Sequence, residues 1–158
     1  MPDDTAFLPL LTQPLAILTV QLGPPQLLGT TPEGERKIVP VIGGTLKGPR
    51  IDARLLPFGG DWALTRADGV LTLDVRLTAQ TGDGALIHVT YTGQRHGPPA
   101  VMARLARGEA VDPQEMYFRI APCFETAAPA YLWLNRLLAV GIGERLPQGP
   151  RYHIHQVL

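Results

Sequence analysis

Apolar and polar residues alternate most regularly on either side of the turn sequence Thr81-Gly82-Asp83-Gly84. Successive side chains of a β-strand point to opposite faces, so this alternation predicts two strands, Val70–Gln80 and Ala85–Thr92, that pair as a hairpin. The glycines and the aspartate between them are typical of a tight turn. This hairpin is the clearest local structure that the pattern predicts.

The length of the loop decides which side chains share a face of this hairpin. A two-residue Asp83-Gly84 turn would place Asp74 and Arg76 on the same face as Ile87 and Val89. A three-residue loop with Gly84 in the left-handed region pairs even positions with even positions and separates polar from apolar residues. We therefore predict the three-residue loop. Its apolar face consists of Leu71, Leu73, Val75, Leu77, Ile87, Val89 and Tyr91.

A second pair of predicted strands, Tyr117–Thr126 and Tyr131–Val140, is joined by a small loop that contains Pro129. Each strand has one apolar face and one face on which polar and aromatic side chains gather. We expect the polar-aromatic face to line a cavity. Its members are Tyr117, Arg119, Cys123, Glu125, Tyr131, Trp133 and Asn135.

This orientation has a consequence for the apolar face of the same strands. It would leave side chains such as Phe118, Ile120 and Leu134 pointing outward, where a second subunit or a helix would have to cover them. We therefore expect a homo-oligomer or a wall backed by a helix. The alternative is an apolar lumen, a polar exterior and a monomer.

The remaining pattern favours many short strands. Further strands are predicted at Leu15–Leu22, Ile51–Leu56 and Arg151–Leu158, and one helix at Pro98–Arg107, which prolines open and Gly108 closes. The 17 glycines and 16 prolines interrupt the chain often. We predict a single all-β domain over residues 1–158, an antiparallel barrel or sandwich of about nine strands with one short helix. Few aromatic residues and many glycines favour the barrel.

Composition narrows the classes of partner. Fourteen basic residues balance fourteen acidic ones, and a net charge of zero argues against a general nucleic-acid or anionic-membrane binder. The single cysteine, Cys123, excludes an internal disulfide framework and fits a reducing compartment. Asp3 and Asp4 stand where a signal peptide carries positive charge, and no apolar run reaches the ~20 residues of a membrane span. We expect a soluble, cytoplasmic protein.

The polar-aromatic face supplies the candidate chemistry. We assign proton transfer to Glu125 or Asp74, and we assign Arg119 and Arg76 to an anionic oxygen of a ligand. Flat walls for the ligand would come from Trp62 and Trp133, whose alternative role is ordinary core filling. For Asp74 and Arg76 the alternative is an ion pair on the solvated outside of the sheet. The other predicted substrate-binding residues are Tyr117 and Asn135.

Several familiar sites are not expected. His153 and His155 share a strand face, but no third ligand has a recognisable spacing, so we interpret them as solvent-facing and predict no metal. Cys123 could act as a nucleophile with His88 as its base, but a lone cysteine in a strand is more often a small core residue. The sequence lacks a Gly-x-Ser-x-Gly elbow and a phosphate-binding loop.

Several segments together resemble the domain-of-unknown-function family 3237, over about Gly29 to Arg145. They are GTTPEGERKIVPVIGG, GGDW, DVRLTAQTGDGALI, HGPPAVMARLARGE, YFRIAPCFETAAPAYLWLNR and GIGER. The resemblance implies a compact antiparallel β-barrel of calycin-like appearance without an assigned cofactor, and it implies little about the reaction. Leu77, where members often have tyrosine, and Cys123, where arginine or threonine is usual, depart from the pattern and allow a specialised pocket.

These observations lead to one leading hypothesis and two rivals. The leading hypothesis is a cofactor-independent barrel enzyme that acts on a small unsaturated carbonyl compound by cyclisation, conjugate addition or isomerisation, in a natural-product pathway. One rival is a non-catalytic protein that binds a small ligand in the same lumen. The other is a structural or partner-binding module with a filled barrel.

Overall fold

The computed structural model describes residues 5–158. Its elements are β1 (Thr12–Leu22), β2 (Gln26–Thr31), β3 (Gly34–Gly48), β4 (Ile51–Thr65), β5 (Leu71–Thr81), β6 (Leu86–His96), α1 (Pro99–Ala106), η1 (Pro113–Glu115), β7 (Tyr117–Glu125), η2 (Pro129–Arg136), β8 (Leu138–Leu146) and β9 (Gly149–Val157). The two η elements are short 3₁₀ helices.

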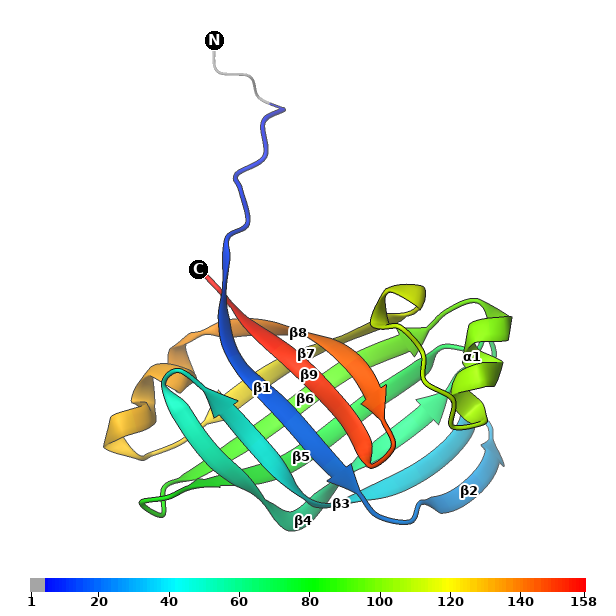
Figure 1. Cartoon of the computed structure of the whole chain (residues 1–158), viewed down its shortest axis with the longest axis horizontal. Helices are drawn as coiled ribbons and strands as arrows, with labels where there is room; N and C mark the ends of the chain where they lie inside the picture. Colours follow the sequence, from blue (N-terminus) through cyan, green and yellow to red (C-terminus); the bar gives the residue numbers. More distant parts are fainter. Residues whose placement is uncertain (1–4) are drawn as a thin grey trace.

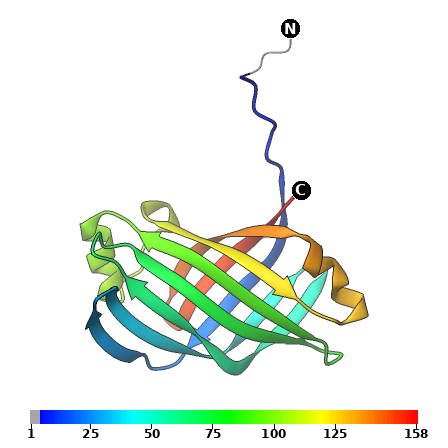
Figure 2. The ribbon, with the colours of Figure 1, turned by 180° about the vertical axis from the view of Figure 1, so that it is seen from behind.

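The strands form one closed antiparallel barrel, as Figures 1 and 2 show. Their order is β1-β9-β8-β7-β6-β5-β4-β3, and the pairing of β1 with β3 closes the ring. The remaining strand, β2, pairs only with the first part of β3 and lies outside the closed ring. Eight strands therefore make the barrel and the ninth extends one edge, which confirms the predicted fold class.

The predicted hairpin is present with the predicted register. Thr78 pairs with His88 and Gln80 with Leu86, so even positions face even positions. Gly84 has a φ of 88°, in the left-handed region, and donates its backbone N–H to the carbonyl of Thr81. All seven residues of the predicted apolar face are buried.

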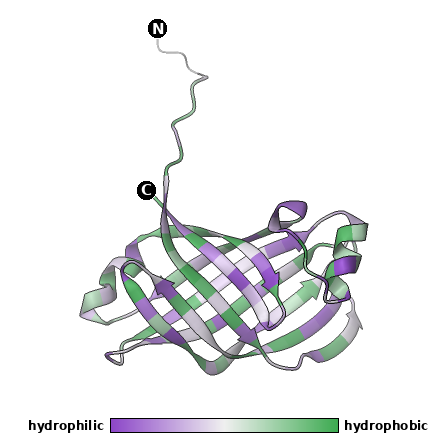
Figure 3. Cartoon of the chain, in the orientation of Figure 1, coloured by the Kyte–Doolittle hydropathy of each residue, from purple (hydrophilic) through white to green (hydrophobic). Residues whose placement is uncertain are grey.

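The interior of the barrel is apolar, so the prediction that the polar-aromatic face lines the cavity is wrong. Phe118, Ile120 and Phe124 of β7 are buried, whereas Tyr117 and Glu125 are exposed. An eight-stranded barrel has an interior just wide enough for side chains, and burying apolar side chains there is strongly favourable. Figure 3 shows the resulting alternation of hydropathy along the strands. The alternative of an apolar lumen and a polar exterior is the one observed.

The second predicted strand of that pair, Tyr131–Val140, is also wrong in its first half. Residues Pro129–Arg136 form the 3₁₀ helix η2, and β8 starts only at Leu138. Proline at the start of η2 favours a helical turn. Leu134 is 1% exposed and points into the barrel, so this helix fills one end of it.

The two ends of the barrel are covered differently. The η2 end holds η2, the β5–β6 turn and the β3–β4 turn, whereas α1 and β2 lie at the opposite end, which we call the α1 end (Figure 1). Helix α1 confirms the predicted helix, and Val101 is its buried residue. Within residues 5–158, no helix has the length and apolar character needed to cross a membrane.

Candidate functional site

A pocket of 770 Å³ opens at the α1 end of the barrel; we call it the lumen pocket. Strands β3, β4, β6, β8 and β9 and helix α1 all contribute to its lining. Its apolar walls include Leu22, Leu73, Met102, Leu105 and Phe118. Its polar side chains include Lys37, Asp61, Arg95, Arg145 and Tyr152. The volume falls in the range of small-molecule sites, about 300–1,000 Å³.

The polar side chains reach the pocket because each occupies an inward position near the α1 end of its strand. Arg95 follows Ile87, Val89 and Tyr91 at alternate positions of β6, and those three are buried in the core. Side chains two residues apart share a face of a strand, so Arg95 continues the inward row. The strand is therefore apolar through the middle of the barrel and charged at this end.

Asp61 lies in β4 just beyond a bulge and keeps the inward parity of the earlier part of that strand. Strand β4 continues well beyond the predicted strand Ile51–Leu56, and its register with β5 shifts between Leu55 and Gly59. Gly59 has a φ of 128°, and a Cβ there would lie 2.3 Å from the backbone oxygen of Arg76. Only glycine fits this position without strain. After the bulge Asp61 points inward and Trp62 outward.

The environment of Asp61 favours its neutral form. The side chain is 9% exposed, and burial raises its pKa to about 6 from the usual 3.8. The Asp74 backbone N–H donates a hydrogen bond of 3.1 Å to Oδ1 of Asp61, and this bond and the charge of Lys37 partly oppose the rise in pKa. A carboxyl group with a pKa near neutrality can both accept and donate a proton under physiological conditions.

Three cationic side chains surround this single carboxylate. Burial lowers the pKa of Lys37, Arg95 and Arg145, and the charge of Arg145 lowers that of Arg95 further. Among residues 5–158 none of the three forms an ion pair with an acidic side chain, and Nε of Arg95 is buried without a hydrogen-bond partner. The Arg95 guanidinium lies 5.7 Å from the ring centroid of Phe118. The pocket therefore holds more positive than negative charge.

Aromatic side chains lie behind these charged groups. The ring of Tyr152 packs edge-on against Tyr91 and Phe118, with centroid distances of 5.2 Å and 5.3 Å. Burial raises the pKa of both tyrosines, and the interaction between their two hydroxyl groups raises the pKa of Tyr91 further and partly opposes the rise at Tyr152. An uncharged hydroxyl can serve a ligand as a hydrogen-bond donor or acceptor.

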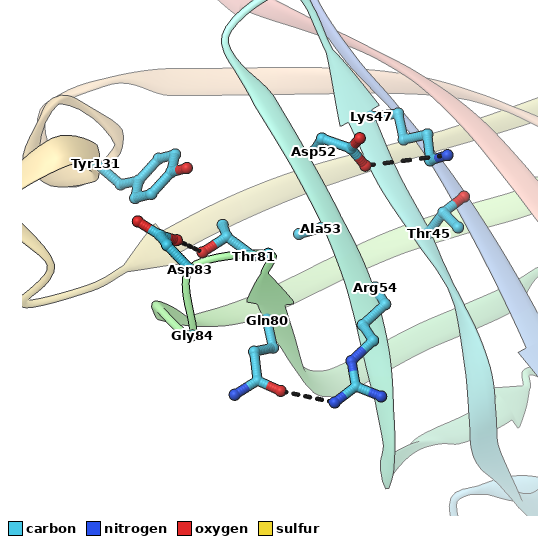
Figure 4. Close-up of a pocket in the computed structure, with 11 residues that line it drawn as sticks. Thr45, Lys47, Asp52, Ala53, Arg54, Gln80, Thr81, Asp83, Gly84 and Tyr131 are labelled. Carbon is cyan, nitrogen blue, oxygen red and sulfur yellow. Dashed lines mark hydrogen bonds and ion pairs between the residues drawn. The ribbon is translucent and has the colours of Figure 1, made fainter.

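A second hollow, of 820 Å³, lies at the η2 end and is shown in Figure 4. Its polar groups already pair with one another. Lys47 and Asp52 form an ion pair of 3.9 Å, Arg54 donates a hydrogen bond of 2.9 Å to Gln80, and Thr81 bonds Asp83. It lacks the excess of unpaired buried charge found in the lumen pocket, so we place the candidate site at the α1 end.

The predicted catalytic residues lie on the outer face of the barrel. Asp74 and Arg76 form an exposed ion pair of 3.9 Å, which was the alternative interpretation of these two residues. Arg119 lies 5.1 Å from the ring centroid of Tyr117 and is directed away from the lumen pocket. Glu125 is exposed and pairs across the strands with His88. None of these side chains lines the lumen pocket or the hollow at the η2 end.

The predicted aromatic walls are also separated from the lumen pocket. Trp62 lies on the outside, 5.8 Å from the guanidinium of Arg76, and Trp133 of η2 is covered by Arg50 at 3.7 Å. Asn135 is a structural residue, because its side-chain amide exchanges two hydrogen bonds of 2.8 Å with the backbone of Thr126. This clamp holds η2 to the end of β7.

The cysteine and the histidines have surface positions. Cys123 is exposed, so its interpretation as a core residue is wrong: it shares the outward parity of Tyr117 and Glu125. His153 confirms the solvent-facing interpretation and lies 3.5 Å from Glu144. Among residues 5–158 no group of three or more His, Cys, Asp or Glu side chains could hold a metal ion.

Sequence reasoning missed the residues of the lumen pocket, although a signal for them exists. Each is a charged residue on the apolar parity of its strand, near one end. Arg95 continues the row that the hairpin register had already defined. Asp61 shares the parity of Ile51, Ala53 and Leu55, and it directly follows the two glycines of the bulge.

Comparison with known proteins shows the family. The model described as "Protein of unknown function (DUF3237)" matches residues 11–157. An uncharacterised UPF0311 protein from Rhodopseudomonas palustris is 38% identical over 141 residues, which cover 89% of this chain and 92% of that protein. The crystal structure of a protein of unknown function from the same organism has a TM-score of 0.92 at 37% identity, covering 96% of this chain and 100% of that one.

Two further solved structures share the barrel. A β-barrel-like protein from Acinetobacter baumannii has a TM-score of 0.84 at 38% identity, covering 98% of this chain and 100% of that one. An enzyme from Penicillium herquei has a TM-score of 0.74 at 23% identity, with 98% of both chains covered, a likeness that shows the fold alone. The chain thus belongs to the DUF3237 family, whose function is unknown, and it has the family's barrel in closed antiparallel form.

Proposed function

We propose that this protein is an enzyme that binds a small unsaturated carbonyl compound in the lumen pocket and transfers protons on it through Asp61. The observation that carries the proposal is the buried Asp61 carboxyl group, whose pKa of about 6 matches the requirement of a general acid and base. The same pocket contains cations that would stabilise negative charge on a carbonyl oxygen. Isomerisation, conjugate addition and cyclisation of such compounds all need these two functions.

The proton transfer can be written with this chain's own groups. Ionised Asp61 takes a proton from a carbon next to the carbonyl group, and the electron pair of the broken C–H bond moves toward the carbonyl oxygen. Arg95 and Arg145 stabilise the enolate oxygen that results, and Asp61 returns the proton at another carbon. Walls such as Phe118 and Leu105 would exclude water from the reacting atoms.

Two other considerations bear on the proposal. The structural neighbour from Penicillium herquei is described as an enzyme, so a barrel of this kind is compatible with catalysis. The rival function is a binding protein that uses the same pocket without turnover. In a binding protein of this kind the ligand would bind in the lumen pocket, but Asp61 would transfer no proton to or from it.

Hydrogen exchange on a simple unsaturated ketone tests the proposal. The protein is incubated with benzylideneacetone in deuterated buffer, and loss of the protons next to the carbonyl group is followed by NMR. We expect exchange above the buffer rate, and about a hundredfold less in Asp61→Asn, which is a typical loss for a general base. Asp74→Asn and Glu125→Gln, which alter exposed carboxylates on the outer face, serve as controls and should exchange like the wild type. Equal rates in wild type and Asp61→Asn would contradict the enzyme and leave the binding protein.

A further inference from the structure

We infer that the natural ligand of the lumen pocket enters as an organic anion, a small carboxylate attached to an apolar unsaturated or aromatic body. The inference rests on the proposed function only in taking this pocket as the ligand site; it does not require turnover. It concerns the charge that the ligand carries before any reaction.

The charge of the pocket is the first observation. Lys37, Arg95 and Arg145 face one carboxylate, Asp61, so the pocket is positive even when Asp61 is ionised. The whole chain has a net charge of zero, so the excess does not reflect a generally basic protein. It is concentrated at one end of the lumen.

The lack of partners is the second observation. Several arginines elsewhere have acidic partners: Arg104 pairs with Glu115 at 2.8 Å, Arg107 with Glu109 at 2.8 Å, and Arg151 with Glu144. Those pairs are partly exposed, where an unpaired charge would cost little. The three cations of the pocket are at least half-buried and lack an acidic partner within residues 5–158, although burial makes an unpaired charge expensive. An anionic ligand would remove this cost.

The geometry of the donors indicates the type of anion. Two guanidinium groups line the same pocket, and the planar fork of a guanidinium matches the two oxygens of a carboxylate. The neutral Tyr152 hydroxyl lines the same pocket and could donate to a carboxylate oxygen.

The rest of the lining indicates the body of the ligand. Phe118 and Leu73 lie on the barrel side, and Met102 and Leu105 of α1 lie on the other. Such walls bind an alkenyl or aromatic group by apolar burial, and flat side chains favour flat ligands. A ligand that satisfies both regions is an amphiphilic carboxylate.

A matched pair of probes separates charge from shape. trans-Cinnamate is an unsaturated aromatic carboxylate, and trans-cinnamamide is its neutral counterpart of nearly the same shape. Calorimetric titration of the wild type should show that cinnamate binds at least about tenfold more tightly than cinnamamide, as expected when charge-assisted hydrogen bonds to arginine are made.

Three arginine variants locate the effect. Arg95→Gln and Arg145→Gln should each weaken cinnamate binding about tenfold and leave cinnamamide binding unchanged. Arg76→Gln removes the same charge from the outer face and should bind both probes like the wild type. Should Arg95→Gln fail to fold, Arg145→Gln, whose side chain is half-buried, carries the test alone.

Three results would overturn the inference: cinnamamide binding as tightly as cinnamate, an equal loss in Arg76→Gln, or no binding of either probe at millimolar concentration. The outcome is independent of the proposed catalysis. A wild type that prefers cinnamate but exchanges no proton of benzylideneacetone would refute the enzyme and keep the anion site. Proton exchange on benzylideneacetone that depends on Asp61, together with equal binding of cinnamate and cinnamamide, would support the enzyme and refute the anion site.

Discussion

Two adjacent residues of β4 have opposite environments in this barrel. Asp61 and Trp62 stand together in the Gly-Gly-Asp-Trp segment, yet one lies in the lumen pocket and the other on the outer surface. Adjacent side chains of a strand point to opposite faces, and the bulge at Gly59 shifts the register with β5 by two residues, so odd positions of β4 face inward both before and after it. The sequence analysis assigned a role to the tryptophan, whereas the proposed proton transfer belongs to its neighbour.

Asp61 should make stability depend on pH in a particular direction. Its pKa is about 6 in the folded protein and near 3.8 when unperturbed, so between these values the folded protein holds a proton that the unfolded chain has lost. Raising the pH through this window therefore destabilises the fold. Asp61→Asn keeps an oxygen that can accept the Asp74 N–H and removes the titration. We expect this variant to be more stable than the wild type by about 1–3 kcal/mol at pH 8, and nearly equal to it at pH 4.

Denaturant unfolding at both pH values measures this difference. Asp52→Asn provides the control, because the side chain of Asp52 is 80% exposed and its loss should change stability little at either pH. A variant Asp61→Asn that is less stable than the wild type at pH 8 would show that Asp61 is needed as an anion, contrary to its buried position.

A strand or helix could be predicted from the sequence where its local pattern of apolar and polar residues fits only one secondary structure. The β5–β6 hairpin was predicted with its register because seven apolar residues fit one face in only one way. Residues 131–140 were not, because an alternating pattern of apolar residues also fits a short 3₁₀ helix followed by a strand. What selects the helix is the clamp between Asn135 and Thr126, a contact between two segments that no local pattern reveals.

The turn of this hairpin allows a test with two glycines. Gly84 has a φ of 88°, and Gly82 has no positive φ, while a Cβ at either would meet nothing within 4 Å. Gly84→Val should therefore destabilise the protein by about 1–2 kcal/mol, because a β-branched residue resists positive φ. Gly82→Ala should have a milder effect. Equal shifts of the two variants in denaturant melts would argue against backbone conformation as the cause.

At the scale of the whole molecule, closure of the barrel determines which face of each strand lies inside, which the sequence pattern alone does not determine. The two faces of each strand were separable from the pattern, but which face lies inside follows from the narrow interior of the barrel. Lys37, Asp61, Arg95 and Arg145 come from four strands that only the closed ring brings to one end. The fold was therefore largely predictable, whereas the site depended on an arrangement that appears only after the strands have closed.

The predicted oligomer was meant to cover Phe118 and Leu134 on the outside of the barrel, but both point inward. Other apolar residues are exposed instead. In residues 7–11, which precede β1, Phe7 is 99% and Leu8 94% exposed. Leu138 and Val140 of β8, 72% and 45% exposed, lie on the outer wall and pair with Val157 and His155 near the end of β9. Figure 1 shows the N-terminal arm leaving the barrel beside the end of β9.

A second copy of this chain would cover both surfaces. The exposed apolar residues are Phe7, Leu8, Leu10, Leu11, Ile17, Leu138, Val140 and Ile142. A fully exposed large apolar residue offers about 150–200 Å², so together they expose roughly 900 Å² per copy. This area is close to the ~800 Å² that each partner buries in a stable interface. The arm and the wall belong to the same chain, so a two-fold dimer can bury each arm on its partner's wall. We expect a dimer in sedimentation at micromolar concentration, and a monomer for Leu8→Ser with Leu10→Ser. A monomeric wild type, or binding of the arm to neutral lipid vesicles instead, would contradict the dimer.

The filled η2 end of the barrel has a consequence for how a ligand enters and leaves the lumen pocket. Leu134 fills that end, and the middle of the barrel is packed with buried side chains such as Leu77 and Ile154, so the packed core separates the lumen pocket from the η2 end. A ligand that enters at the α1 end would leave by the same end, so a bound molecule would delay the entry of the next one. A substitution in α1, whose Met102 and Leu105 line the pocket, would therefore alter the rates of entry and exit together.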